Sequence, residues 1–164
     1  METAAAWSLA LEHRDGPCAL VLTRQKLPLL DRPAAFKAED IFTGAYILEE
    51  EQGEQQAVVV ATGSELAPAA AAARKLGIRA VSMPSLELFL AQPQDARETL
   101  LPPGWKVAVV EASRDAGWHQ LLGPDGLLIG MSGFGASAPA SDMAEHFGFT
   151  DQAIETRLTD WLKK

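Results

Sequence analysis

The residues that suggest chemistry most directly are Gly133, Gly135 and Ala138, which have the G-x-G-x-x-A spacing of a dinucleotide-binding turn. The apolar run LLIGM at 127–131 precedes them, and Glu155 lies downstream at a distance that suits a ribose-binding carboxylate. In such a turn, glycines let the backbone approach a pyrophosphate at the amino end of a helix. The spacing alone is therefore compatible with a nucleotide site.

The context of this turn disagrees with a nucleotide site. A dinucleotide-binding turn follows the first strand of its fold, and its acidic residue ends the second strand. Here the turn follows the last predicted strand, and Glu155 lies inside a helical pattern. We interpret the stretch as a strand-to-helix connection in which Gly133 and Gly135 provide positive φ or close backbone packing. Ser137 would then cap the helix, and Pro139 would occupy its first turn.

Arg24 is the strongest candidate for a binding residue. It directly follows CALVLT at 18–23, a continuous apolar run typical of a buried strand. Ligands of open α/β sheets gather at the carboxyl ends of strands, where a guanidinium could bind a phosphate through two parallel hydrogen bonds. Gln25 and Lys26 add further donors. From these residue types alone, the commoner alternative is an ordinary exposed arginine in a loop.

Glu111 is a second polar residue at a predicted strand end, because it closes the apolar run KVAVVE at 106–111. Its position would suit a ligand at the carboxyl edge of the sheet. The alternative, which we favour, is a structural hydrogen bond at the edge of the sheet or of a subunit.

Metal and hydrolase sites find little support in the sequence. His13, His119 and His146 are scattered, and no two of them have metal-ligand spacing. No G-x-S-x-G elbow accompanies the serines. The one cysteine, Cys18, precludes an internal disulfide, and its apolar surroundings predict a buried, inert thiol.

Length and charge narrow the class of protein further. A chain of 164 residues corresponds to one domain, or to one domain plus a piece of another. The net charge of −8 argues against nucleic acid and anionic membranes as partners. No apolar run approaches the ~20 residues of a membrane span, and the first residues lack the basic start of a secretion signal. We therefore expect a cytoplasmic protein.

Strand-like and helix-like segments alternate through most of the chain, which predicts an α/β protein with a largely parallel sheet. Ser64 and Gly77 are suited to cap and to end the alanine-rich helix that follows the ATGSE turn. The predicted strands are 18–23, 44–50, 56–62, 78–83, 106–113 and 127–131, and the predicted helices are 3–13, 65–77, 84–92, 93–101, 139–148 and 150–164.

One boundary stands out near residues 28–40, where the pattern of strands and helices is interrupted. A single helix and a single strand precede it, which is too little to form a domain. The first part of the chain therefore looks like the end of something larger.

Five motifs occur in an order that resembles the C-terminal end of transketolase. They are LVLTRQKLP, VVVATGSEL, VSMPSLELF, VAVVEAS and GFGASAPASDMAEHFGFT, and the resemblance covers nearly all of the chain. It implies the end of the pyrimidine-binding domain at 1–33 and the transketolase C-terminal domain at 34–164. The expected fold is a three-layer α/β/α unit with a mostly parallel, mixed five-stranded sheet.

The resemblance also implies a function. Transketolases use thiamine diphosphate and a divalent metal, Mg²⁺ or Ca²⁺, to move a two-carbon ketol unit between sugar phosphates of the pentose phosphate pathway. They act as homodimers with active sites between subunits. The arginine of the family's TRQ or SRQ motif contacts the substrate phosphate, and it matches Arg24. Arg24 is therefore the expected substrate-binding residue.

The chain departs from the family by lacking the Gly-Asp-Gly…Asn diphosphate motif, the paired histidines of the first domain and the activating glutamate of the second. We therefore expect no catalytic residue, no bound cofactor and no activity in this chain alone. The alternative is a non-catalytic assembly or regulatory module of another thiamine enzyme, of the deoxyxylulose phosphate synthase or 2-oxoacid dehydrogenase type.

Overall fold

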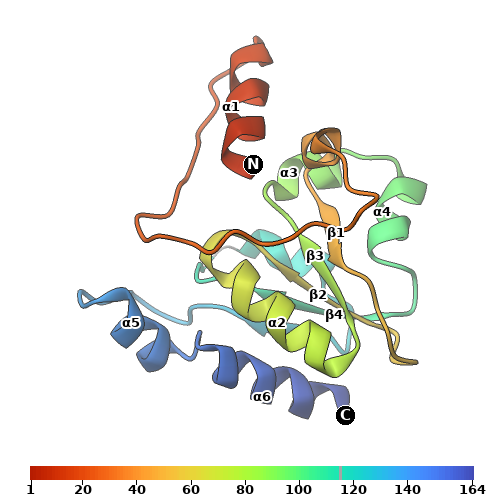
Figure 1. Ribbon diagram of the computed structural model, residues 1–164, viewed down its shortest axis with the longest axis vertical. Coiled ribbons are helices and arrows are strands. Elements are labelled where there is room, and N and C mark those ends of the chain that lie inside the picture. The colour runs from red at the N-terminus through yellow and green to blue at the C-terminus, as the bar shows by residue number, and fades with distance from the viewer. Residues whose placement is uncertain (115) are drawn as a thin grey trace.

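The computed structural model describes residues 1–114 and 116–164, and its described strands form one five-stranded sheet of order β1-β3-β2-β4-β5 (Figure 1). The strands are β1 Tyr46–Glu49, β2 Ala57–Ala61, β3 Arg79–Ser82, β4 Lys106–Val110 and β5 Leu127–Ile129. The α-helices are α1 Glu2–Glu12, α2 Leu66–Leu76, α3 Leu86–Leu90, α4 Gln94–Leu100, α5 Ala140–Phe147 and α6 Asp151–Leu162, and the 3₁₀ helices are η1 Ala38–Thr43, η2 Gly63–Glu65 and η3 Ala116–Leu121.

The centre of the sheet is parallel because its strands are buried on both faces. In β2, every residue from Ala57 to Ala61 is buried, and this strand pairs in parallel with β3 on one side and β4 on the other. Such continuous apolar runs are typical of strands covered by helices on both faces. β1 alone among the described strands is antiparallel, which makes the sheet mixed, as expected.

Two apolar clusters cover the two faces and complete a three-layer arrangement. Alternate β2 residues point to opposite faces, so that Val59 joins the cluster with α2 and α6 while Val58 joins the cluster with α3 and Trp118 of η3. In Figure 1, α2 and α6 run together along one side of the sheet. The predicted three-layer fold is therefore confirmed.

Some of the helix ends have the capping residues that the sequence predicts, and one does not. Gly77 has a left-handed backbone at the end of α2, as predicted. Thr150 caps α6, because its side chain accepts a hydrogen bond from the Ala153 amide at 3.3 Å. The prediction that Ser64 caps α2 is wrong: a 3₁₀ turn precedes the helix, and the Ser64 hydroxyl donates to Glu65 at 2.8 Å instead.

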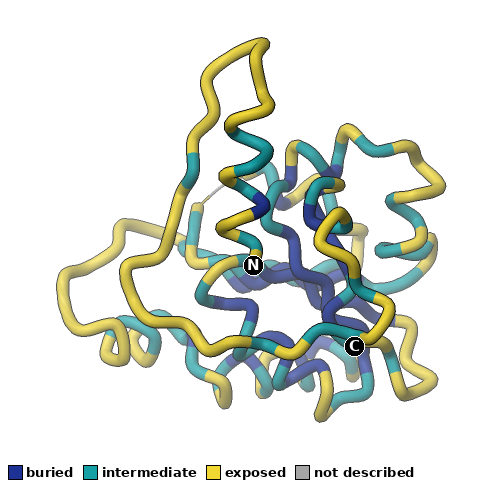
Figure 2. Tube along the Cα trace, turned by 45° about the horizontal axis from the view of Figure 1, so that its top comes forward, coloured by how far each residue is buried: buried dark blue, intermediate teal, exposed yellow. Residues whose placement is uncertain are grey.

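The predicted strand at 18–23 is absent. The segment is extended but pairs with none of the five strands, and Val21 is 95% exposed (Figure 2). Cys18 is exposed as well, which contradicts the predicted buried thiol. A strand needs neighbouring backbone to satisfy its N–H and C=O groups, and the described chain brings no strand to this position.

The loop after β5 also differs from its prediction. Neither Gly133 nor Gly135 has a positive φ, and a Cβ added at either glycine would meet open space. The residue that precedes the first turn of α5 is Pro139 rather than Ser137. The connection is therefore an exposed loop, with Phe134 97% exposed, and not a tightly packed turn.

Arg79 fixes the amino end of β3. Its guanidinium is buried and contacts the carboxylate of Glu51 through two hydrogen bonds of 2.8 and 2.9 Å. It also donates to the carbonyl oxygens of Thr99 and Leu100, and it lies 4.8 Å from the ring centroid of Trp105. One side chain thereby connects the loop after β1, the end of α4 and the start of β4.

These contacts predict a large loss of stability for Arg79→Met, about 3–5 kcal/mol, because the carboxylate and carbonyls would lose their buried donor. Arg74→Met is the control, since Arg74 pairs with Glu49 on the surface and its loss costs under about 1 kcal/mol. Denaturant unfolding measures both.

The effect of Arg79→Met should also depend on pH. Hydrogen bonding from Arg79 lowers the pKa of Glu51, so the pair stabilises the fold above the ordinary glutamate pKa and loses that effect as pH falls. The difference from wild type should therefore shrink below about pH 4. Equal losses of unfolding free energy for Arg79→Met and Arg74→Met would contradict this role of Arg79.

Candidate substrate-binding edge

The segment that carries Arg24 lies at the carboxyl edge of the sheet. A methyl carbon of Thr23 lies 3.7 Å from the position that a Cβ would occupy on Gly63. Gly63 opens the turn that follows β2, and its φ of 55° is one that glycine adopts readily. The TRQ and ATGSE motifs, which are far apart in the sequence, thus lie side by side.

The Arg24 side chain itself is exposed. Within the described residues, its guanidinium forms neither an ion pair nor a hydrogen bond, whereas the buried Arg79 guanidinium is fully engaged. An exposed guanidinium at the carboxyl edge of a parallel sheet can accept an anionic ligand without first breaking an internal contact.

Glu111 lies at the same edge, directly after β4. Its amide donates to the Ile129 carbonyl at 3.0 Å, and the Met131 amide donates to the Ser113 carbonyl at 2.9 Å. These bonds continue the pairing between β4 and β5 past the last strand residues. The half-buried Glu111 thus extends the sheet through its backbone, and the role of its side chain stays a prediction.

A buried polar cluster around Glu2 holds the N-terminal part of the chain against the sheet. The same carboxylate oxygen of Glu2 accepts hydrogen bonds from the Tyr46 hydroxyl and the Ser82 hydroxyl, both at 2.6 Å. Arg32 lies 3.9 Å from that oxygen. Burial, and then the Glu2 carboxylate, raise the pKa of Tyr46, so that it remains a donor at neutral pH.

Arg32 closes this cluster from the other end of the N-terminal segment. Its guanidinium lies 5.8 Å from the ring centroid of Phe36 and 5.6 Å from that of Tyr46, and it donates to the carbonyl of Leu30. The two rings are themselves in tilted contact at 4.8 Å. The N-terminal part of the chain is therefore held at two points, by Glu2 at the start of α1 and by Arg32.

Sequence reasoning missed the Glu2 cluster. Glu2 is 44 residues from Tyr46 and 80 residues from Ser82, and no local pattern connects such positions. An acidic residue in the first turn of an amphipathic helix is most simply explained by the helix dipole. The one available signal was the polar Ser82 inside an apolar strand.

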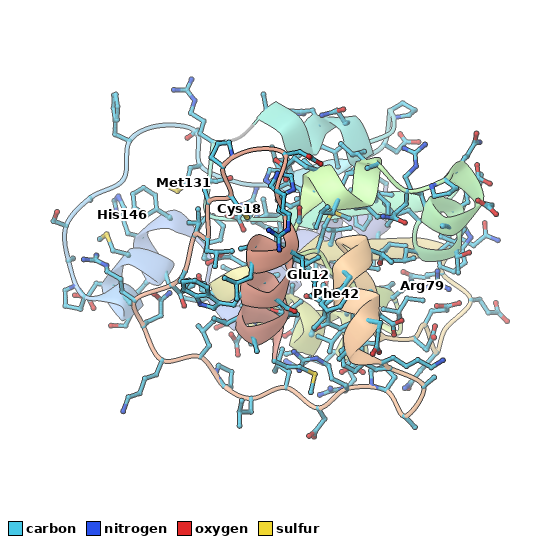
Figure 3. The ribbon with its side chains drawn as sticks, turned by 90° about the horizontal axis from the view of Figure 1, so that it is seen from above. Glu12, Cys18, Phe42, Arg79, Met131 and His146 are labelled. Atoms are coloured by element: carbon cyan, nitrogen blue, oxygen red, sulfur yellow. The ribbon has the colours of Figure 1, made fainter. Side chains whose placement is uncertain are left out.

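The remaining candidates do not converge on a site. In the described residues, no three histidine, cysteine, aspartate or glutamate side chains come together in a way that could hold a metal ion. Figure 3 shows Cys18, Met131 and His146 on one side of the molecule and Arg79 on the opposite side. None of the helices in the described ranges is long and apolar enough to cross a membrane.

The fold and its edge define an α/β domain with an exposed arginine, Arg24, at the carboxyl edge of its sheet. A family model for the transketolase-like C-terminal domain matches residues 44–150. The chain therefore belongs to the transketolase family, through its C-terminal domain.

Individual relatives agree with this family. Transketolase 2 of Xanthobacter flavus is 48% identical over 94% of this chain, which corresponds to 23% of that protein. Among solved structures, transketolase from Leishmania mexicana superimposes with a TM-score of 0.85 at 37% identity, covering 99% of this chain and 24% of its own. A Pichia stipitis transketolase in complex with sedoheptulose-7-phosphate superimposes with a TM-score of 0.87 at 30% identity. This match also covers 99% of this chain and 24% of the other. The chain thus spans about a quarter of the length of the transketolases that it matches.

The Glu2 cluster leads to a prediction about the N-terminal segment. Glu2→Ala leaves the buried Tyr46 and Ser82 hydroxyls without their acceptor, so α1 and residues 13–31 should detach while the sheet stays folded. Limited proteolysis should then cut this segment at least about tenfold faster.

Glu12→Ala is the matched control, because Glu12 is an exposed carboxylate of the same helix. It should leave the rate of cleavage unchanged. Equal rates for Glu2→Ala and wild type would show that the cluster does not hold the segment.

Proposed function

We propose that this chain forms the C-terminal portion of a transketolase, an enzyme that transfers a two-carbon ketol unit between sugar phosphates. The observation that carries the proposal is the exposed, uncommitted Arg24 of the TRQ motif, held beside the ATGSE turn in a chain of this family. In this role Arg24 binds the phosphate of the substrate. The complex of the Pichia stipitis relative with a sugar phosphate supports this class of ligand.

The N-terminal residues would belong to the neighbouring domain of such an enzyme. We assign residues 1–33 to the end of the pyrimidine-binding domain and 34–164 to the C-terminal domain. The first part presents an apolar surface that this chain leaves uncovered, made of Trp7, Leu11, Val21, Leu22 and Leu29. Exposed apolar surface of this kind is typical of an interface with more protein. In a complete enzyme, residues 18–23 would join a sheet supplied by the preceding sequence.

Thiamine diphosphate and its metal do not fit residues of this chain. The sequence lacks a Gly-Asp-Gly…Asn motif and contains no asparagine, and no group of carboxylates, histidines or cysteine in the described part could hold a metal ion. The cofactor and its Mg²⁺ or Ca²⁺ would therefore be bound by the other domains of the enzyme. This chain would bind the substrate phosphate and supply an assembly surface, within a cytoplasmic homodimer.

A chimera tests the proposal. This chain should replace the corresponding portion of Xanthobacter flavus transketolase 2, its 48% identical relative, with retention of activity. In the active chimera, Arg24→Ala should raise KM for phosphorylated donors about 10- to 100-fold, as expected for the loss of a charge-assisted contact. Donors without a phosphate should be unaffected.

Two controls accompany this measurement. Lys26→Ala removes a charge from the same exposed segment and should change KM by less than about threefold. The isolated chain should show no turnover. Turnover by the isolated chain, or an equal effect of Arg24→Ala on donors with and without phosphate, would contradict the proposal.

A further inference from the structure

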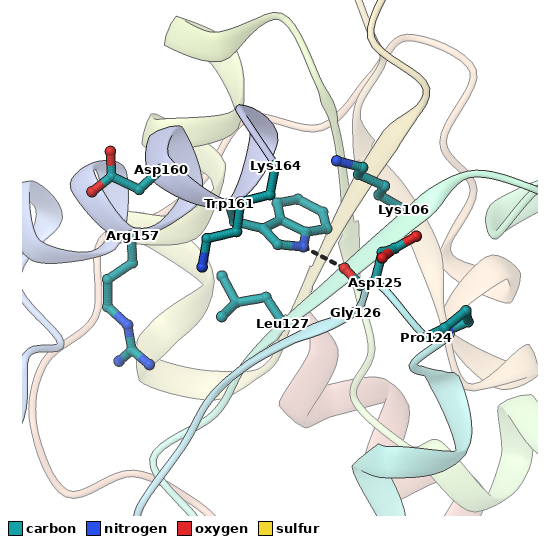
Figure 4. A pocket seen from close by; sticks show the side chains of 9 residues that line it. All are labelled: Lys106, Pro124, Asp125, Gly126, Leu127, Arg157, Asp160, Trp161 and Lys164. Atoms are coloured by element: carbon teal, nitrogen blue, oxygen red, sulfur yellow. Dashed lines mark hydrogen bonds between the residues drawn. The ribbon is translucent and has the colours of Figure 1, made fainter.

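A pocket lies at the opposite edge of the sheet from Arg24. It has a volume of about 430 Å³ and opens between the amino ends of β4 and β5 and the last turns of α6 (Figure 4). Its lining consists of Lys106, Pro124, Asp125, Gly126, Leu127, Arg157, Asp160, Trp161 and Lys164. None of these residues belongs to the motifs that relate the chain to its family.

The charges of this pocket favour an anion. Lys106, Arg157 and Lys164 contribute three cations, and within the described chain none of them forms an ion pair. Asp160 is paired with Lys163 at 3.2 Å, so among the carboxylate side chains of the lining Asp125 is the one without an ion pair to a described residue. An excess of positive charge at this pocket is notable in a chain of net charge −8.

The cationic groups surround an apolar floor. In Figure 4, Lys106 and Arg157 lie on opposite sides of the Trp161 indole, and the side chain of Lys164, which follows α6, ends near Leu127. The Lys106 ammonium lies 6.0 Å from the indole centroid, and Arg157 donates to the Leu128 carbonyl at 3.4 Å. A ligand could therefore place an anionic group between the cations and its carbon skeleton on Leu127.

The walls of the pocket are fixed. The Trp161 indole N–H donates to the Asp125 carbonyl at 2.6 Å, which joins α6 to the turn before β5. Gly126 in that turn has no room for a side chain, because a Cβ would lie 2.8 Å from Leu122. A rigid wall reduces the entropy cost of binding.

We propose that this pocket binds the phosphate group of a small phosphorylated compound, at a second anion site separate from Arg24. A phosphate offers three oxygens and up to two negative charges, which suits a pocket whose lining includes a planar guanidinium and two ammonium groups. A carboxylate offers one charge and two oxygens, and a single arginine would satisfy it. The site does not depend on the proposed function of Arg24.

Titration of the ¹⁵N-labelled chain with inorganic phosphate tests this site, with chloride of equal ionic strength as the reference. We expect saturable shifts of the Trp161 indole N–H and of the Gly126 and Leu127 amides, with a Kd of about 1–10 mM. Lys106→Gln/Arg157→Gln should weaken this binding at least about tenfold. Lys164→Gln, a single change on the exposed end of the chain, should weaken it about threefold.

Arg24→Gln/Lys26→Gln is the matched control, because it removes the same two charges at the other edge. It should leave the shifts at the pocket unchanged. The proposal is overturned if phosphate causes no saturable shift beyond that of chloride. It is also overturned if the control weakens binding as much as Lys106→Gln/Arg157→Gln, because the response would then follow net charge and not this pocket.

Discussion

The hydrogen bonds to the Glu2 carboxylate are the contacts on which the candidate binding edge depends. They join the first turn of α1 to Tyr46 in β1 and to Ser82 in β3, so the N-terminal segment starts from a fixed point on the sheet. At the other end of the N-terminal segment, the Arg32 guanidinium lies 3.9 Å from the same Glu2 oxygen. Between these two ends, Thr23 contacts Gly63 and Arg24 reaches the carboxyl edge. The partly buried Glu2 carboxylate is stable here because two hydroxyl donors and a guanidinium replace part of its hydration.

The two edges of the sheet differ in the side chains that they carry. At the carboxyl edge, an exposed arginine lies beside a glycine turn, on a segment whose apolar side chains are uncovered. At the amino edge, Arg79 uses every part of its guanidinium to connect loops, and the pocket beside α6 is lined by cations that form no ion pair within the described residues. The carboxyl edge is thus suited to combine with further protein, whereas the amino edge is closed by internal contacts of Arg79 and leaves a cationic pocket open to solvent.

The sequence predicted those elements whose stability is local or that lie at the centre of the sheet. The apolar runs of β2 and β4 form buried strands, and Gly77 and Thr150 end and begin helices as expected. The run at 18–23 has the same composition but remains extended and exposed, because a strand also needs paired neighbours. The apolar composition of a segment shows that its side chains suit a buried strand, but it does not show whether neighbouring strands are present to pair with it. Arg24 was predicted to follow a buried strand that the structure lacks; it still lies near the carboxyl edge because of long-range contacts, which carried no local signal.

Amide hydrogen exchange at residues 18–23 tests most directly whether this chain is one part of a larger transketolase. The account predicts fast exchange in the isolated chain, where these amides pair with no strand, and slow exchange in the chimera with the Xanthobacter flavus enzyme, where the preceding sequence would supply the neighbouring strands. Equally fast exchange of these amides in an active chimera would contradict the account, because the segment would then remain outside any sheet when the enzyme is complete.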